Sequence, residues 1–173
     1  MLVGDPAPWF RARALSGSPT YAFDTAAGRP ILMLFHTSAS EPKAAAALNL
    51  VQQHRRLFDD IGLCFFGVTT DPGDEASARI AQQLPGIRHF LDYDKAEHRL
   101  FALSGEAGEP PHWIALDRAL RVIGTFPAER GLEAIERAAS AATNSEPPWA
   151  PVVRAGRRNR RSMSDPGASS PRP

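Results

Sequence analysis

The segment from Ile31 to Lys43 could carry chemistry, because it places hydroxyls and an imidazole where a strand meets a helix. It reads Ile-Leu-Met-Leu-Phe-His-Thr-Ser-Ala-Ser-Glu-Pro-Lys. An apolar run ends at His36, a short loop carries Thr37 and Ser40, and Pro42 opens a predicted helix. A thiol at such a helix amino terminus can be tuned to ionise near neutral pH. Ser40 carries a hydroxyl instead, which needs an adjacent base to become a nucleophile.

The pattern around this segment predicts a strand, a helix and a second strand. Residues 31–35 and 63–69 are nearly continuous apolar runs, which suit strands buried on both faces of a sheet. Ser38 and Glu41 stand three apart, as a capping box requires, and Ser40 is also an ordinary capping residue type. Apolar spacing then predicts a long helix with one buried stripe. That stripe consists of Ala47, Leu50, Val51, His54, Leu57, Phe58 and Ile61.

The rest of the first 143 residues continues the alternation of strands and helices. We predict an amino-terminal hairpin, a helix over 75–84 after a loop at 70–74, a strand over 88–91, a helix over 95–103, a hairpin over 112–116 and 121–126, and a helix over 129–143. The closing helix should bury Leu132 and Ile135, and Trp9 and Trp113 should be core aromatics. This order indicates an α/β fold with a mixed central sheet.

Composition describes a soluble globular chain with a different carboxyl-terminal part. The 173 residues are 43% hydrophobic and 23% charged, with a net charge of +1 that favours neither nucleic acid nor an acidic membrane as partner. Residues 144–173 hold six arginines and two acids, so their charge of +4 leaves −3 on residues 1–143. We therefore predict one domain over 1–143 and a disordered, basic, Pro/Ser/Arg-rich tail over 144–173.

Three motifs in this order resemble the peroxiredoxins, the alkyl hydroperoxide reductase/thiol-specific antioxidant branch of the thioredoxin-like superfamily. Residues 4–10, Gly-Asp-Pro-Ala-Pro-Trp-Phe, are similar to the family's Gly-Asp-x-Ala-Pro-x-Phe opening. Residues 67–71, Gly-Val-Thr-Thr-Asp, resemble its Gly-Val-Ser-x-Asp strand end, and residues 111–117 resemble the segment that enters a strand and ends in Ile-Asp. The resemblance implies a thioredoxin-like three-layer α/β/α fold with a mixed central sheet and an amino-terminal β-hairpin.

The resemblance also implies an antioxidant oxidoreductase activity, thiol-dependent peroxide reduction, but its nucleophile is missing. The family motif is Pro-x-x-x-Thr-x-x-Cys. Residues 37–40 keep the Thr as Thr37 and replace the Cys with Ser40, while Met33 stands in place of the Pro. The thioredoxin alignment of residues 40–43 over Cys-x-Pro-Cys gives the same substitution at Ser40. An activating Arg is expected near the start of the 111–117 strand, where the chain has His112.

Cys64 is the only cysteine, so it is the only alternative nucleophile and no internal disulfide can form. It lies inside an apolar predicted strand. Burial in such surroundings raises the pKa of a thiol and makes it inert, which favours a core packing role.

His36 and His112 are candidate binding residues, because the expected fold brings their strands together with Thr37 and Ser40 between them. A Ser–His hydrolytic pair or a two-His metal site would need a carboxylate at diagnostic spacing, and the sequence offers none, so we expect no metal and no cofactor. Pro111 stands where thioredoxin-like proteins often place a cis-proline, with an ordinary trans proline as the alternative.

The sequence therefore predicts a catalytically degenerate redoxin domain that serves in binding or scaffolding. Similar domains form the amino-terminal part of larger oxygenases that use iron and 2-oxoglutarate, and this chain lacks a His-x-Asp…His iron site. The alternatives are an active thiol peroxidase through Cys64 and an anion binder at the predicted helix start. As partners we expect a homodimer, plus a thiol reductant and peroxide if the domain is active. We expect no nucleic acid, no membrane and a cytoplasmic location.

Overall fold

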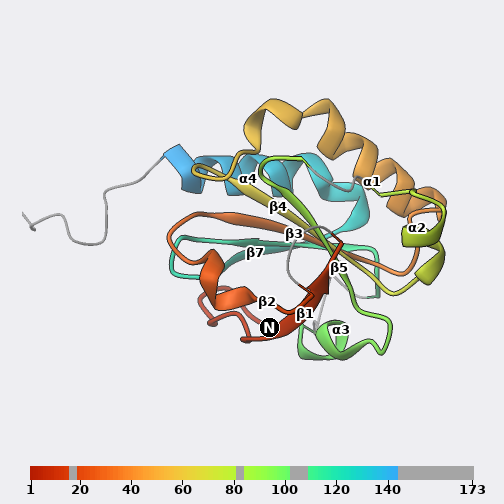
Figure 1. Ribbon diagram of the computed structural model, residues 1–173. Helices are drawn as coiled ribbons and strands as arrows, with labels where there is room; N and C mark the ends of the chain where they lie inside the picture. The colour runs from red at the N-terminus through yellow and green to blue at the C-terminus, as the bar shows by residue number, and fades with distance from the viewer. Residues whose placement is uncertain (16–18, 81–83, 102–108, 144–173) are drawn as a thin grey trace, which may run out of the picture.

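The computed structural model describes residues 1–15, 19–80, 84–101 and 109–143, and these form one seven-stranded mixed sheet with helices on both faces (Figure 1). The strand order is β2-β1-β5-β4-β3-β6-β7. The strands are β1 (Arg11–Ala14), β2 (Tyr21–Ala22), β3 (Ile31–His36), β4 (Cys64–Thr69), β5 (Ile87–Leu91), β6 (His112–Leu116) and β7 (Val122–Pro127). The central three strands, β3, β4 and β5, are parallel, and the outer strands join them antiparallel. This is the thioredoxin-like α/β fold that the sequence predicts.

The helices are α1 (Pro42–Gln53), α2 (Pro72–Ala76), α3 (Ala96–Leu100) and α4 (Gly131–Thr143), with 3₁₀ turns η1 (Phe23–Ala26), η2 (Arg55–Leu57) and η3 (Ala128–Arg130). In Figure 1, α1 and α4 lie on one side of the sheet, and α3 and the amino-terminal segment lie on the other. Successive residues of a strand point to opposite faces, so each central strand must be apolar at every position to bury both. All six residues of β3 and all six of β4 are buried.

The two faces of the sheet carry separate hydrophobic cores. Leu32, Leu34 and Trp113 pack under α1 and α4 with Ile135. On the opposite face, an aromatic core of phenylalanines packs against Met33 and Ile114. That core consists of Phe10, Phe23, Phe35, Phe66, Phe90 and Phe101. Packing on both faces of the sheet holds the ends of β3 and β4 in place. The loops that follow these strands therefore start from fixed positions.

Two helices differ from the sequence prediction. The helix predicted to reach Ile61 ends at Gln53, and Leu57 and Ile61 are 42% and 86% exposed rather than part of a buried stripe. Arg55 donates to the carbonyl of Phe58, and this contact accompanies the turn that replaces the helix. The helix predicted over 75–84 instead occupies Pro72–Ala76, since Asp71 caps it by accepting from the amide of Gly73. Residues 81–83 lie outside the described part of the chain.

Of four further residues predicted to be buried, two are buried and two are exposed. Trp113 is fully buried as expected, but Trp9 is 77% exposed and Leu132 is 51% exposed, so those two core assignments are wrong. The buried side of α4 is formed by Gly131, Ala134, Ile135 and Ala138, a narrow small-residue stripe that lets the helix lie close to the sheet. The predicted tail over 144–173 lies outside the described residues. Within them, no helix is both long and apolar enough to cross a membrane.

Candidate functional site

The candidate site lies where β3 and β4 end, at the carboxyl edge of the parallel strands. His36 is the last residue of β3 and pairs with Thr69, the last residue of β4. Residues 37–41 then lead into α1, and residues 70–71 lead into α2. Because both loops leave the sheet at the same edge, their side chains meet although they are more than 30 residues apart in sequence.

Ser38 is the centre of the hydrogen bonds in this site. Its hydroxyl donates to Asp71 Oδ2 at 2.6 Å, and it shares a 2.8 Å hydrogen bond with the hydroxyl of Ser40. It also accepts from the backbone amide of Ser40 at 3.2 Å. The predicted capping box is wrong, because the N-cap of α1 is Glu41 and no side chain caps the helix. Ser38 and Ser40 are therefore free to bond to the β4–α2 loop.

Asp74 is fully buried and joins the two loops through hydrogen bonds. Its Oδ2 accepts from the amide of Ala39 at 2.8 Å and from the hydroxyl of Thr69 at 2.6 Å. Its Oδ1 lies 3.3 Å from the hydroxyl of Ser38 and 3.4 Å from Arg79 Nη1. A buried carboxylate is tolerated when its oxygens are saturated with donors, as these are.

Arg79 is the cation of the site. Its Nη1 donates to Asp71 Oδ2 at 3.0 Å, so one guanidinium faces two carboxylates. The hydrogen bond from Ser38 and the amide of Gly73 hold the pKa of Asp71 below its usual value, with Arg79 adding to the effect. Two carboxyl groups thus face one guanidinium, and this arrangement disfavours a further anion at Ser38 or Ser40.

His36 lies beneath this cluster with its ring fully buried. Its Nδ1 is 4.0 Å from Asp74 Oδ2, beyond hydrogen-bond distance, and neither ring nitrogen has a hydrogen-bond partner among the described residues. Burial lowers the pKa of His36 to about 4, with Asp74 opposing the shift. The imidazole is therefore neutral at pH 7 and lies behind the loop.

His112 does not join His36, because the strand register separates them. β6 aligns His112 with Phe35, one residue before His36, so the two imidazoles point to opposite faces of the sheet. The His112 ring stacks on Phe35 with centroids 5.3 Å apart. The Pro110–Pro111 bond is cis, and the buried Pro111 leads directly into β6 beside the end of β3.

Cys64 lies at the other end of the sheet. It is the first residue of β4 and pairs with Ile31, five residues before the edge that carries the site, or about 17 Å along the strand. The residue is 1% exposed, and its thiol contacts the carbonyl of Asp59 at 3.3 Å. Burial raises the pKa of this thiol, and two nearby arginines offset the effect only in part.

The sequence analysis found Ser40 and Thr37 but missed the residues that hold the loop. Thr37 contributes its carbonyl, which accepts from the hydroxyls of Thr69 and Thr70, rather than its side chain. Asp71, Asp74 and Arg79 were not singled out. The signal was present at Asp71-Pro72, since Asp before Pro is a helix start with an N-cap and Pro in its first turn.

A separate acidic group lies near α3. Carboxylate oxygens of Asp92, Asp94 and Glu97 come within 4.8 Å of one another, the only cluster of metal-ligand type among the described residues. Asp92 already accepts from the ring of His98 at 2.6 Å and from the amides of Glu97 and His98. These contacts make it a cap for α3.

Comparisons with known proteins identify the fold. A scan against protein-family models finds no match, and a search of the curated proteins finds none. Among solved structures, the thioredoxin domain of a thiol-disulfide oxidoreductase from Bacteroides vulgatus is similar with a TM-score of 0.60 and 17% identity, covering 79% of this chain and 97% of that one.

A peroxidoxin and a peroxiredoxin are similar to the same degree. The peroxidoxin BcpB from Mycobacterium tuberculosis matches with a TM-score of 0.58 and 17% identity, over 81% of this chain and 97% of that one. The reduced 2-Cys peroxiredoxin of Plasmodium vivax matches with a TM-score of 0.59 and 14% identity, over 78% and 94%. The chain thus has the thioredoxin-like fold that peroxiredoxins and thiol-disulfide oxidoreductases share.

Proposed function

We propose that this chain is a peroxiredoxin-like binding module that has lost thiol peroxidase chemistry. One observation carries the proposal. The site at the end of β3 contains the hydroxyls of Ser38 and Ser40, while the only thiol, Cys64, is buried about 17 Å away at the other end of β4. The chain keeps the fold, but the site at the end of β3 has no sulfur atom among the described residues.

The chemistry of peroxide reduction supports this reading. A thiolate attacks the O–O bond, one oxygen is transferred to sulfur as a sulfenic acid, and a second thiol then reduces it. A serine hydroxyl has no such oxidation cycle. Among the described residues, no base accepts directly from Ser40: its hydroxyl bonds to that of Ser38, and neither ring nitrogen of His36 has a hydrogen-bond partner.

The local charges argue in the same direction. Peroxidatic thiols are activated by cations and helix amino termini. Here Asp71 and Asp74 are close to Ser38, and Arg79 is engaged by both of them. The loop is instead held by hydrogen bonds between two elements, which suits a rigid surface for a partner rather than a nucleophile that must react and regenerate.

The assay for this proposal is peroxide consumption coupled to dithiothreitol. We expect the wild-type protein to consume hydrogen peroxide no faster than the dithiothreitol blank. A rate above the blank that is lost in Cys64→Ser would contradict the proposal and establish the alternative, a thiol peroxidase acting through Cys64. Circular dichroism of both proteins shows that a missing rate does not come from misfolding.

The proposed context of the module is the amino-terminal part of a larger oxygenase that uses iron and 2-oxoglutarate, in the cytoplasm, either alone or as a homodimer. The abrupt change of composition after Val153, into Arg-, Ser- and Pro-rich sequence, motivates it. Sequencing the locus downstream of the codon for residue 173 tests it: an oxygenase-like coding sequence there supports this context, and its absence removes it. Sedimentation velocity of the purified chain distinguishes monomer from dimer.

A further inference from the structure

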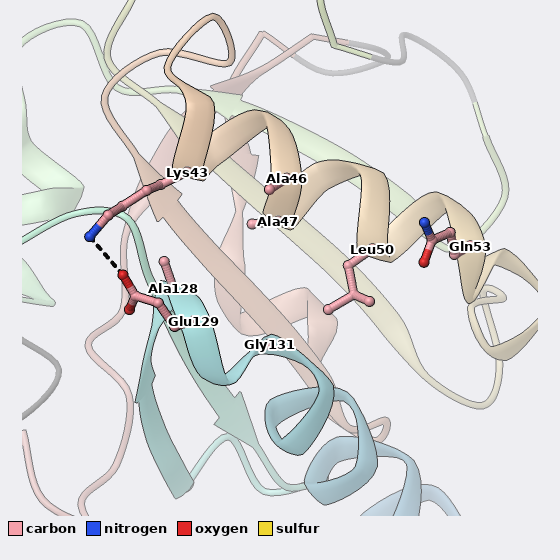
Figure 2. A pocket seen from close by; sticks show the side chains of 8 residues that line it. All are labelled: Lys43, Ala46, Ala47, Leu50, Gln53, Ala128, Glu129 and Gly131. Atoms are coloured by element: carbon pink, nitrogen blue, oxygen red, sulfur yellow. Dashed lines mark ion pairs between the residues drawn. The ribbon is translucent and has the colours of Figure 1, made fainter.

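A shallow groove of about 360 Å³ runs between α1 and the start of α4 (Figure 2). Ala46, Ala47 and Leu50 line it from α1, and Ala128 and Gly131 line it from the opposite side. Ala47 is buried, Leu50 is partly buried and Ala46 is exposed. The groove is thus an apolar strip that the described residues leave open.

Glycine at position 131 makes room for Leu50 in this groove. A Cβ there would lie 2.8 Å from Leu50 Cδ2 and 3.0 Å from Trp113 Cζ2, so a larger residue would have to displace the Leu50 side chain. The absence of a side chain lets Leu50 lie against the start of α4. The two ends of the groove are polar: Lys43 and Glu129 form a 2.6 Å ion pair at one end, and Gln53 lies at the other.

We propose that residues 147–153 of this same chain occupy the groove. They follow α4 after only three residues and read Pro-Pro-Trp-Ala-Pro-Val-Val, an apolar segment without a charge. Its three prolines favour the polyproline II conformation, and Pro148-Trp149-Ala150-Pro151 has the Pro-x-x-Pro spacing of segments that dock into apolar grooves. Prolines lower the entropy that such a segment loses on docking.

The lengths of segment and groove agree. Trp149 is six residues after Thr143, the last residue of α4, so the two can lie up to about 20 Å apart. From Gln53 to Lys43 α1 rises over ten residues, or about 15 Å. From Trp149 to Arg154 a polyproline II segment advances over five residues, or about 16 Å. With Trp149 at the Gln53 end, Arg154 therefore reaches the Glu129 end.

Charge favours the same arrangement. Residues 144–173 carry +4 and residues 1–143 carry −3, so attraction raises the concentration of the tail near the domain. At the groove end, Glu129 is exposed and pairs only with Lys43 among the described residues, which leaves its carboxylate able to accept from Arg154 as well. The groove is then a site for Pro-rich apolar peptide, and its resting occupant is the chain itself.

Disulfide trapping tests the proposal in the full chain. Ala46→Cys places a thiol in the groove, and Ala150→Cys places one in the segment. The matched control pairs Ala150→Cys with Ala27→Cys, since exposed Ala27 lies near the end of α4, where Arg118 bridges the carbonyls of Gly28 and Ala142. Cys64 is buried and is kept in every variant. Each cysteine substitution made alone shows whether its new thiol forms a disulfide with Cys64.

Under diamide at micromolar protein concentration, we expect the Ala46→Cys pair to close within one chain at least tenfold faster than the Ala27→Cys pair. Equal rates, or faster closure at position 27, would overturn the proposal, because an undocked tail reaches both positions. Disulfides that form only between chains would also overturn it and would assign the groove to a second copy.

Acrylamide quenching of tryptophan fluorescence tests independently whether the segment is docked. In a Trp9→Phe background, Trp113 is buried and Trp149 becomes the tryptophan that reports on the tail. Ala46→Arg fills the groove, whereas Ala45→Arg places the same charge on an exposed neighbouring position outside it. We expect acrylamide to quench the Ala46→Arg protein at least twofold more strongly than the Ala45→Arg protein. Identical quenching in the two proteins contradicts the docked segment.

Discussion

Asp74 accepts a 2.8 Å hydrogen bond from the backbone amide of Ala39, and this bond joins the loop after β3 to the helix after β4. In a redox protein of this fold, the loop after β3 presents a reactive sulfur. Here the same loop is held in place by a buried carboxylate that also accepts from Thr69. The loop is thus held by hydrogen bonds to a buried carboxylate, and it presents hydroxyls in place of a thiol.

Replacing Asp74 by asparagine should destabilise the domain by about 2 to 4 kcal/mol, because its NH2 group must face other donors in either orientation, Ala39 N and Thr69 Oγ1 or Arg79 Nη1, and leaves them unpaired. Asp71→Asn is the matched control. Asp71 is partly exposed and asparagine caps helices well, so this change should cost much less stability than the change at Asp74. Urea unfolding measures both, and equal losses in the two variants would contradict the anchoring role of Asp74.

Stability should fall as pH drops from 6.5 toward 4. Burial lowers the pKa of His36 and of His112 to about 4 and that of His89 to about 3. Below pH 6.5 these three histidines bind protons in the unfolded chain but not in the folded one, so unfolding takes up three protons and acid favours it.

One carboxyl opposes this trend. Burial and a hydrogen bond with Asp92 raise the pKa of Glu97, so above about pH 4.5 the folded chain keeps a proton that the unfolded chain releases. The net uptake near pH 5.5 is two protons, or about 2 to 3 kcal/mol per pH unit. Above pH 6.5 only the Glu97 effect remains, and stability declines as pH rises.

Urea midpoints between pH 4.5 and 8 should therefore pass through a maximum near pH 6.5. His112→Phe keeps the stacking on Phe35 and removes one titrating group, so it should reduce the acid slope by about a third to a half. A midpoint that stays constant from pH 7 to 5 would show that these imidazoles are not buried as the structure has them.

Gly67→Ala should destabilise the domain by about 1 to 3 kcal/mol through overpacking. A Cβ at position 67 would lie 2.4 Å from Nδ1 of His89, which pairs with Gly67 across β4 and β5. His89→Ala opens that space. The double variant should therefore be more stable than the sum of the two single changes predicts, and strict additivity would count against the contact.

Ser40→Cys should not restore peroxidase activity. The new thiol would lie beside Ser38, whose hydroxyl is bound by Asp71, and the net negative surroundings should keep the pKa of the thiol at or above about 8.5. Iodoacetamide alkylation against pH measures that pKa, with Ser140→Cys on exposed α4 as the reference. A thiol at position 40 that ionises below the reference would show that Arg79 dominates the local field.

Much of the fold could be predicted because its signals are local. Continuous apolar runs marked β3 and β4, and two β-favouring runs on either side of a four-residue turn marked the hairpin of β6 and β7. The end of α1 could not be predicted from periodicity, since Leu57 and Ile61 keep helical spacing yet face solvent. There the contact of Arg55 with the carbonyl of Pro85, thirty residues away, accompanies the change of direction.

Some residues of the candidate site could likewise be predicted from the sequence, and others could not. Ser40 and Thr37 could be located from the strand–loop–helix pattern alone. The partners of Ser38 could not, because Asp71 and Asp74 lie 33 and 36 residues later and meet it only after β3 and β4 pair. The separation of His36 from His112 likewise depends on a one-residue register between strands, which sequence spacing does not reveal.

The most direct measurement of the central claim is the reaction of Cys64 with hydrogen peroxide in the native protein, followed by intact mass and by dimedone labelling of sulfenic acid. We predict no added oxygen on the folded chain over minutes at micromolar peroxide, and ready oxidation once urea exposes the thiol. Rapid sulfenic acid formation at Cys64 in the folded protein would contradict the account.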